Sequence, residues 1–218
     1  ANGALVWTNS PENFATVALA VDTSGNVVVT GTAYNYIWVG DEGGYFLSGD
    51  YYTAKYAAAN GALLWERRYA GPADSDDRAA AVLVDPSGNV IVTGMTLSTN
   101  GSSASYTAKY AAADGALLWE KQLNGRANIR DNFSVALDST GNLVMAGHGN
   151  GGTDIAKYAT GDGALLWEKS ISNSIRAVVD GSGNIVTTGA RHNGTNNDYY
   201  TAKYAATDGA LLWEKHYN

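Results

Sequence analysis

One phrase recurs four times along the chain, and this repetition limits the possible folds more than any other feature of the sequence. It reads YTAKYAAANGALLWE at 52–66, YTAKYAAADGALLWE at 106–120, DIAKYATGDGALLWE at 154–168 and YTAKYAATDGALLWE at 200–214. Its last part also opens the chain, as ANGALVW. A period of roughly 50 residues is typical of repeat architectures, in which each repeat is one supersecondary unit. We therefore expect four repeats of one kind.

A second phrase alternates with the first and divides each repeat into strands. It reads VDTSGNVVVTG at 21–31, VDPSGNVIVTG at 84–94, LDSTGNLVMAG at 137–147 and VDGSGNIVTTG at 179–189. Each repeat thus holds four short apolar segments, named a to d, which in the first repeat are roughly ATVALAVD, NVVVTG, YYTAKYA and ALLWERRY. Segments rich in Val, Thr, Tyr and Trp and bounded by Gly, Asn, Asp or Ser indicate strands rather than helices.

The connections between these segments predict hairpins. The a–b connection is Asp-x-Ser/Thr-Gly-Asn, whose Gly can take a positive φ and whose Asp can accept hydrogen bonds from its own turn. The c–d connection ends in Asn-Gly or Asp-Gly, a strong signal for a short hairpin. Four strands joined in this way make an antiparallel meander of roughly 50 residues, which is the size of a propeller blade.

The composition of the strands favours a propeller over a sandwich. Segments such as AAAVLV at 79–84 and VVVTG at 27–31 do not alternate between apolar and polar residues, so both of their faces are expected to be buried, as in stacked blades. The sequence predicts an all-β chain, a β-propeller of four tandem four-stranded antiparallel blades plus one surplus N-terminal strand. In this single repeat domain of residues 1–218, the orphan outer strand is expected at 1–8, and the blades at 9–69, 70–123, 124–171 and 172–218.

The two phrases together resemble the bacterial SBBP-type β-propeller repeat, and the similarity covers nearly the whole chain. The Gly-x-x-x-Trp hairpin is also similar to the tryptophan-docking motif of quinoprotein-type propellers, in which the Trp of an outer strand wedges between blades. This resemblance implies a structural role for Trp7, Trp65, Trp119, Trp167 and Trp213. The chain departs from the SBBP propellers, which have seven blades, because it holds four repeats.

The composition argues against several classes of partner. Fourteen Lys and Arg against 21 Asp and Glu give a formal net charge of −7, and an acidic chain without a basic patch is a poor candidate for nucleic-acid binding. The absence of Cys removes disulfides and thiolate metal sites. No apolar run approaches the ~20 residues of a membrane helix, so no membrane insertion is expected. Enrichment in Ser, Thr, Asn and Gly favours an extracellular or cell-surface protein.

Polar residues that repeat in every blade are interpreted as architecture. They are Lys55, Lys109, Lys157 and Lys203 of segment c, Glu66, Glu120, Glu168 and Glu214 of segment d, and Asp22, Asp85, Asp138 and Asp180 of the a–b turn. We expect cross-strand Lys–Glu pairs rather than a ring of acid–base pairs. We expect capped turns rather than calcium sites, because calcium takes about 6–8 oxygens. The three His lie in different repeats and no catalytic motif occurs, so we predict no enzyme, no cofactor and no metal site.

The b–c connection of the first repeat, AYNYIWVGDEGGYFLSGD, differs from all others in length and chemistry. Exposed aromatic rings beside carboxylates can stack on a sugar or a peptide. The candidate ligand-binding residues are Tyr34, Tyr36, Trp38, Asp41, Glu42 and Tyr45. The same rings can instead pack over the blades or against a neighbouring molecule.

The surplus strand leads to the functional expectation. An unpaired outer strand is rarely left exposed, so residues 1–8 or ALLWEKHY at 210–217 is expected to pair with another copy, unless a longer array supplies the preceding blade. We therefore predict a non-enzymatic scaffold in assembly or adhesion, whose partners are other copies of itself through strand addition. The alternative is a lectin-like module that binds a glycan or peptide on the b–c loop face.

Overall fold

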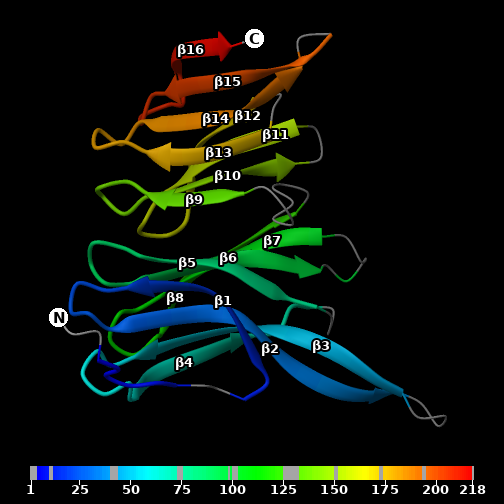
Figure 1. Cartoon of the computed structure of the whole chain (residues 1–218), viewed down its shortest axis with the longest axis vertical. Coiled ribbons are helices and arrows are strands. Elements are labelled where there is room, and N and C mark those ends of the chain that lie inside the picture. The colour runs from blue at the N-terminus through cyan, green and yellow to red at the C-terminus, as the bar shows by residue number, and fades with distance from the viewer. Residues whose placement is uncertain are drawn as a thin grey trace. The chain divides into compact units, whose positions relative to one another are not determined.

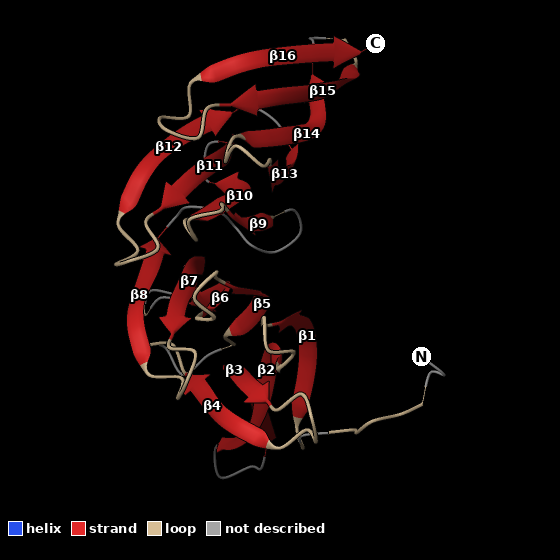
Figure 2. Cartoon of the chain, turned by 90° about the vertical axis from the view of Figure 1, so that its left-hand side faces the viewer, coloured by secondary structure: helices blue, strands red, loops and turns tan. Residues whose placement is uncertain are grey.

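The computed structural model describes residues 4–9, 12–39, 44–72, 76–97, 99, 103–124, 133–149, 152–171, 174–192 and 195–217. Within these ranges every helix or strand element is a strand (Figures 1 and 2). The strands form four sheets of four, and we call them blades 1 to 4 in chain order. No helix that could cross a membrane occurs in this described part of the chain.

The strands of each blade follow one another in chain order across the sheet. Blade 1 comprises β1 (Phe14–Val21), β2 (Val27–Val39), β3 (Gly44–Tyr56) and β4 (Leu63–Tyr69), and blade 2 comprises β5 (Arg78–Val84), β6 (Val90–Leu97), β7 (Ser103–Tyr110) and β8 (Leu117–Asn124). Blade 3 comprises β9 (Ser134–Leu137), β10 (Leu143–Gly149), β11 (Gly152–Tyr158) and β12 (Leu165–Ile171), and blade 4 comprises β13 (Ser174–Val179), β14 (Ile185–His192), β15 (Asn197–Tyr204) and β16 (Leu211–Tyr217). The pairings within each blade are antiparallel, which confirms the predicted meander.

The chain divides into two compact units, residues 1–120 and 121–218, and each has its own core. In the first unit β5 packs against β1, β2 and β3, and buried residues such as Val28, Val90 and Trp65 share one cluster. In the second unit β13 packs against β9, β10 and β11, and Val144, Ile185 and Trp167 share another cluster. Strands β6 and β7 are buried along nearly their whole length. The expectation of two buried faces applies to 79–84, and there β5 is only partly buried.

The two predicted turns form, and their glycines take the expected backbone conformation. In the a–b turn of blade 2, Gly88 has φ +81°, and its N–H donates to the carbonyl of Asp85 at 2.8 Å. The c–d turn of blade 2 is longer than an Asp-Gly hairpin requires, because it is closed by Ala111 N–H donating to the Ala116 carbonyl at 2.8 Å. Gly115 ends this turn with φ +68°, a conformation that Gly adopts without strain.

The long b–c connection of the first repeat is mainly an extension of two strands. Strands β2 and β3 continue to pair from Ala33↔Asp50 to Val39↔Gly44, so the hairpin reaches well into the segment expected to be a loop. The residues Tyr, Ile, Trp and Val in this segment favour extended backbone, and a long loop without regular structure is uncommon in a compact domain. The interpretation of 33–50 as a loop is therefore wrong for the paired residues.

The predicted surplus strand at 1–8 is not present in the described residues of that segment. Residues 4–9 are not a strand, and Figure 2 draws the segment before β1 as a loop. A strand requires a neighbour with which to exchange backbone hydrogen bonds, and the blade 1 sheet consists of β1-β2-β3-β4 without this segment. The side chain of Trp7, within this segment, contacts blade 1.

Substitution of Gly88 by Val should destabilise the chain by at least about 1–2 kcal/mol, because Gly88 has a left-handed φ that a β-branched residue adopts poorly. The matched control is Gly181→Val in the corresponding turn of blade 4, where an added Cβ meets nothing within 4 Å. The free energy of unfolding in urea measures both variants. Equal losses for the two would contradict the assignment of the strained position.

Candidate functional site

The Trp of strand β4 docks on the c–d turn of the next blade. The Trp65 indole N–H donates to the Ala112 carbonyl at 3.3 Å, and the Lys55 ammonium donates to the same oxygen at 3.0 Å. The indole ring lies directly over Gly115, where an added Cβ would come within 2.7 Å of the ring. Its centroid is 6.3 Å from that of Tyr110. Gly115 is therefore needed both for its φ and for the close approach of the ring.

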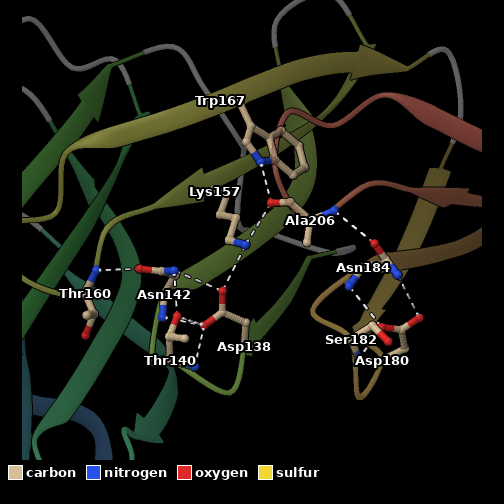
Figure 3. Close-up of polar contacts among 10 residues, drawn as sticks. All are labelled: Asp138, Thr140, Asn142, Lys157, Thr160, Trp167, Asp180, Ser182, Asn184 and Ala206. Carbon is tan, nitrogen blue, oxygen red and sulfur yellow. Dashed lines mark hydrogen bonds and ion pairs between the residues drawn. The ribbon is translucent and has the colours of Figure 1, made fainter.

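The same contact recurs in the second unit, between blades 3 and 4 (Figure 3). The Trp167 N–H and the Lys157 ammonium donate to the Ala206 carbonyl at 3.1 and 2.9 Å. A Cβ on Gly209 would again come within 2.7 Å of the indole ring. Two donors thus converge on one turn carbonyl in each unit. Because a shared carbonyl has two lone pairs, both donors can be satisfied at once.

The N-terminal segment makes this contact without belonging to a blade. The Trp7 N–H donates to the Ala58 carbonyl of blade 1 at 3.0 Å, and a Cβ on Gly61 would lie 2.7 Å from the Trp7 ring. The centroids of Trp7 and Tyr56 are 6.5 Å apart. A short segment is therefore sufficient to occupy the c–d turn of a blade when it carries the docking Trp.

A bulge in the outer strands of blades 1, 3 and 4 positions the docking Trp. In blade 1 Lys55 pairs with Trp65 but Tyr56 pairs with Leu63, so Leu64 is an extra residue in β4. The same shift occurs in blades 3 and 4. A bulge changes the direction of the side chains that follow it. Leu64 remains 47% exposed while Trp65 is 5% exposed, which explains why the repeated phrase contains two leucines before its Trp.

Buried ion pairs connect the a–b turn to the docking lysines. Lys55 lies 2.9 Å from Asp22, Lys109 2.7 Å from Asp85, and Lys157 2.9 Å from Asp138, and each of these side chains is about 3–6% exposed. In blade 4 the corresponding Lys203–Asp180 pair, at 2.6 Å, is 25% and 26% exposed. The expected Lys–Glu cross-strand pairs are therefore wrong, because the lysines extend to the turn rather than to the neighbouring strand.

The turn carboxylate also organises its own loop, as predicted. In blade 2 the Asp85 carboxylate accepts hydrogen bonds from the backbone N–H groups of Ser87 and Asn89, both at 2.9 Å. The Asn89 side-chain carbonyl then accepts from the N–H of Ala112, the residue of the docking carbonyl, at 3.1 Å. Figure 3 shows the corresponding arrangement around Asp138 and Asn142. One polar network therefore joins both turns of a blade.

These contacts determine the protonation of the turn carboxylates. Burial opposes ionisation of Asp22, but hydrogen bonds from Lys55 and Asn26 outweigh it and lower its pKa to about 2. The pKa of Asp85 is lowered in the same way, by Lys109 and Asn89 against the effect of burial. The lysine and the backbone satisfy these carboxylates, which supports the capped-turn interpretation. Among the described residues no group of three or more His, Cys, Asp or Glu is placed to hold a metal ion.

The outer-strand glutamates of blades 1 and 2 accept hydrogen bonds from tyrosines. The hydroxyl groups of Tyr52 and Tyr106 donate to Glu66 and Glu120, each at 2.6 Å. Burial raises the pKa of the Tyr106 hydroxyl, and its hydrogen bond to Glu120 raises it further. These pairs hold strand c against strand d within one blade, so both recurring charged residues of the phrase have structural contacts.

The five predicted docking tryptophans do not have equal environments. Trp65, Trp119 and Trp167 are 5%, 8% and 9% exposed, whereas Trp213 is 40% exposed. Trp7 is half-buried on the blade 1 turn. The predicted burial is therefore correct for three of them and wrong for Trp213, which lies on the last strand of blade 4.

The candidate ligand-binding residues lie on the β2–β3 hairpin or outside the described residues. Tyr34 is half-buried, and its N–H donates to the Asn13 carbonyl at 2.8 Å. The backbones of Tyr36, Trp38 and Tyr45 belong to the hairpin, where Trp38 and Tyr45 are Cα partners. The candidates Asp41 and Glu42 lie outside the described residues.

Three contacts at the blade boundary were not anticipated from the sequence. Arg67 donates to the carbonyls of Gly115 and Asp114 at 2.7 and 2.8 Å, and Tyr69 stacks on Tyr106 with centroids 3.5 Å apart. Asp77 is 1% exposed and accepts from the Gly71 N–H, and burial raises its pKa. The residue after the Glu of strand d is Arg or Lys in every repeat. This recurring basic residue is the sequence feature from which the Arg67 contact could have been predicted.

The fold and these contacts define a β-propeller repeat protein whose neighbouring blades are joined by tryptophan docking. A family model of the PQQ type, described as outer membrane protein assembly factor BamB, matches residues 1–218, and the chain belongs to this family. The resemblance to quinoprotein-type propellers is thereby confirmed, whereas the assignment to the SBBP repeat is not. No curated protein matches the chain significantly.

Solved structures of propellers support the fold. BamB from Moraxella catarrhalis matches with a TM-score of 0.53 and 17% identity over 98% of this chain and 65% of that one. A protein of unknown function from Dyadobacter fermentans gives 0.53 and 10% over 92% and 64%. A quinohemoprotein alcohol dehydrogenase from Pseudomonas putida HK5 gives 0.54 and 15% over 98% and 44%. The chain thus spans less than two thirds of each, and these likenesses concern the fold alone.

Substitution of Asp85 by Asn should destabilise the chain at pH 7 by about 3–5 kcal/mol, because it leaves the buried Lys109 charge without its partner. The pKa of Asp85 is depressed in the folded state, so the advantage of the wild type should be complete above the ordinary pKa of 3.8 and should shrink as the pH falls below it. Urea unfolding at several pH values measures both effects. Asp180→Asn is the control and should cost less, because its pair with Lys203 is more exposed; a larger loss there would contradict the prediction.

Substitution of Trp65 by Ala should lower the free energy of unfolding by about 3–5 kcal/mol, as expected for deletion of a large buried aromatic side chain. The same substitution at Trp213, which is 40% exposed, should cost much less when measured in dilute solution. Melting temperatures of the two variants provide the comparison. Similar losses of stability at Trp65 and Trp213 would show that docking on the next blade does not stabilise the chain.

Proposed function

We propose that this chain is a non-enzymatic β-propeller scaffold of the bacterial cell envelope, which acts in assembly or adhesion and associates with other copies of itself. The family model that matches the chain is described as an outer membrane protein assembly factor. This description supports an envelope location and a role in bringing proteins together. The repeated Lys, Asp, Asn and Trp residues support a structural role, because they contact one another or the next blade in each unit.

The observation that carries the proposal is the docking of the N-terminal segment on blade 1. Trp7 reaches the Ala58 carbonyl and the surface of Gly61 from a segment that is not a strand. The turn of a blade is thus able to bind a short peptide through one indole ring and one hydrogen bond. A scaffold needs this property, since it must hold segments that are not part of its own sheets.

Self-association through a terminal strand is part of the same proposal. Of the two terminal segments expected to take this role, residues 4–9 are not a strand, whereas β16 is the last strand of blade 4 and is exposed along its whole length. Because β16 is exposed along its whole length, it is the strand through which we propose that copies associate.

The scaffold proposal is tested with a chain lacking residues 1–8 and a fluorescent peptide of sequence ANGALVW. The truncated chain should bind the peptide saturably, because its blade 1 turn is free, and the intact chain should bind it more weakly, because Trp7 competes. Fluorescence anisotropy measures both affinities, and a peptide with Ala in place of its Trp is the matched control. Equal binding of the two peptides would contradict the proposal.

The β2–β3 hairpin of blade 1 favours a second candidate function, that of a lectin-like glycan or peptide binding module. Its strands span 13 residues each, against 7 or 8 in the corresponding strands of the other blades. The added length contains the candidate residues Tyr36, Trp38 and Tyr45. Glycan-array binding that falls on Trp38→Ala, together with failure of the peptide experiment, would favour this function over the scaffold.

A further inference from the structure

Blade 4 exposes one face of its last two strands, and this face is rich in aromatic and basic residues. We call it the blade 4 docking face, and it consists of Tyr199, Thr201 and Lys203 of β15 and their Cα partners Tyr217, Lys215 and Trp213 of β16. A shallow depression on this face is lined by all of these residues except Lys203. Tyr199 and Tyr217 are each 57% exposed. A cluster of exposed aromatic side chains is typical of an interaction site.

The equivalent face of blade 1 is covered by blade 2. The Cα pairs of the blade 4 docking face correspond to Tyr51↔Tyr69, Thr53↔Arg67 and Lys55↔Trp65 of blade 1, with the same register. In blade 1 these positions are used for docking: Tyr51 is 2% exposed, and Tyr69 stacks on Tyr106 of blade 2. The blade 4 docking face therefore has the residues and the register of a surface that binds another blade, with Lys215 at the position of Arg67.

The two hydrogen-bond donors of a docking contact are both present on this face. Lys203 pairs with Asp180 as the other docking lysines pair with their aspartates, but it is 25% exposed, where Lys55 and Lys157 are 5% and 6% exposed. Trp213 lies opposite Lys203 in the register, as Trp65 lies opposite Lys55. In blades 1 and 3 the corresponding pair binds one turn carbonyl of the next blade. The blade 4 pair thus has the arrangement that binds such a carbonyl.

Blade 1 carries a turn of the required kind. Its Ala58 carbonyl, Gly61 and Tyr56 correspond to the carbonyl, glycine and tyrosine that receive Trp65 on blade 2, and Trp7 now contacts all three. The segment that delivers Trp7, NGALVW, repeats the DGALLW that delivers Trp213 with two changes, Asn for Asp and Val for Leu. Trp7 therefore occupies the position that a blade bearing a Trp on its outer strand would fill.

We propose that the blade 4 docking face binds blade 1 of a second copy of this chain, with Trp213 and Lys203 taking the Ala58 carbonyl and Trp213 displacing Trp7. This inference rests on the proposed scaffold function and names the partner and the surface of its self-association. The donor face lies on blade 4 and the acceptor turn on blade 1, so the contact is head-to-tail, and it extends unless a ring closes. The N-terminal segment competes with the incoming copy for the turn and thereby weakens association.

The experiment uses two complementary variants of the full chain. Trp213→Ala removes the donor and leaves the acceptor turn, whereas Gly61→Ala leaves the donor and places a Cβ 2.7 Å from the position of the docked ring. Sedimentation equilibrium should show that the wild type self-associates, that each variant alone is monomeric, and that a mixture of the two forms a one-to-one heterodimer. A mixture that stays monomeric, or variants that associate as the wild type does, would overturn the proposal.

Two further variants keep the test independent of the folding of Gly61→Ala. Trp7→Ala should tighten self-association by at least about tenfold. In the wild type Trp7 occupies the blade 1 turn, and its removal leaves that turn open to a second copy. Leu212→Ala is the matched control, since Leu212 is 52% exposed on the same strand but is not part of the blade 4 docking face, and its association should equal that of the wild type. A loss as large as that of Trp213→Ala, or a Trp7→Ala chain that stays monomeric, would refute the proposal.

The outcome also separates this proposal from the scaffold function on which it rests. If copies remain monomeric while the truncated chain still binds the ANGALVW peptide, the scaffold function stands and blade 4 does not dock on a second copy. If the peptide fails to bind as well, both proposals are refuted.

Discussion

The structure depends on one backbone carbonyl in the c–d turn of a blade, which accepts hydrogen bonds from both the Trp and the Lys of the preceding blade. At Ala112 and at Ala206 these donors lie between 2.9 and 3.3 Å from the oxygen. The arrangement requires a glycine under the indole ring, a bulge that aims the Trp and a carboxylate that holds the Lys. Most of the repeated sequence can be explained as support for this contact.

The buried lysine stabilises the contact only when both of its partners are in place. Its ammonium group is removed from water, and a buried charge without a partner is strongly destabilising. The aspartate of the a–b turn supplies the opposite charge, while the turn carbonyl of the next blade accepts a further hydrogen bond. Folding of one blade and docking of the next are therefore coupled, because the lysine is fully satisfied only when both have occurred.

Local features of this fold could be predicted from the sequence, and contacts that depend on distant residues could not. The strands, the positive φ of Gly88 and the Asp85 cap follow from residues only a few positions apart. The pairing of Lys109 with Asp85 rather than with Glu120 depends on how three strands align, so residue type alone did not reveal it. The exposure of Trp213 depends on its neighbours and not on its phrase, which is the same as that of Trp167.

The uniform chemistry of the docking contact bears on how such chains change length in evolution. Since the Trp, the Lys and the receiving turn have the same form in both units, duplication or loss of one whole repeat would join two surfaces that already fit. Stability would then change by one blade and one boundary at a time, as in other linear arrays. The number of blades is in this sense a variable that selection can adjust without redesigning any single blade.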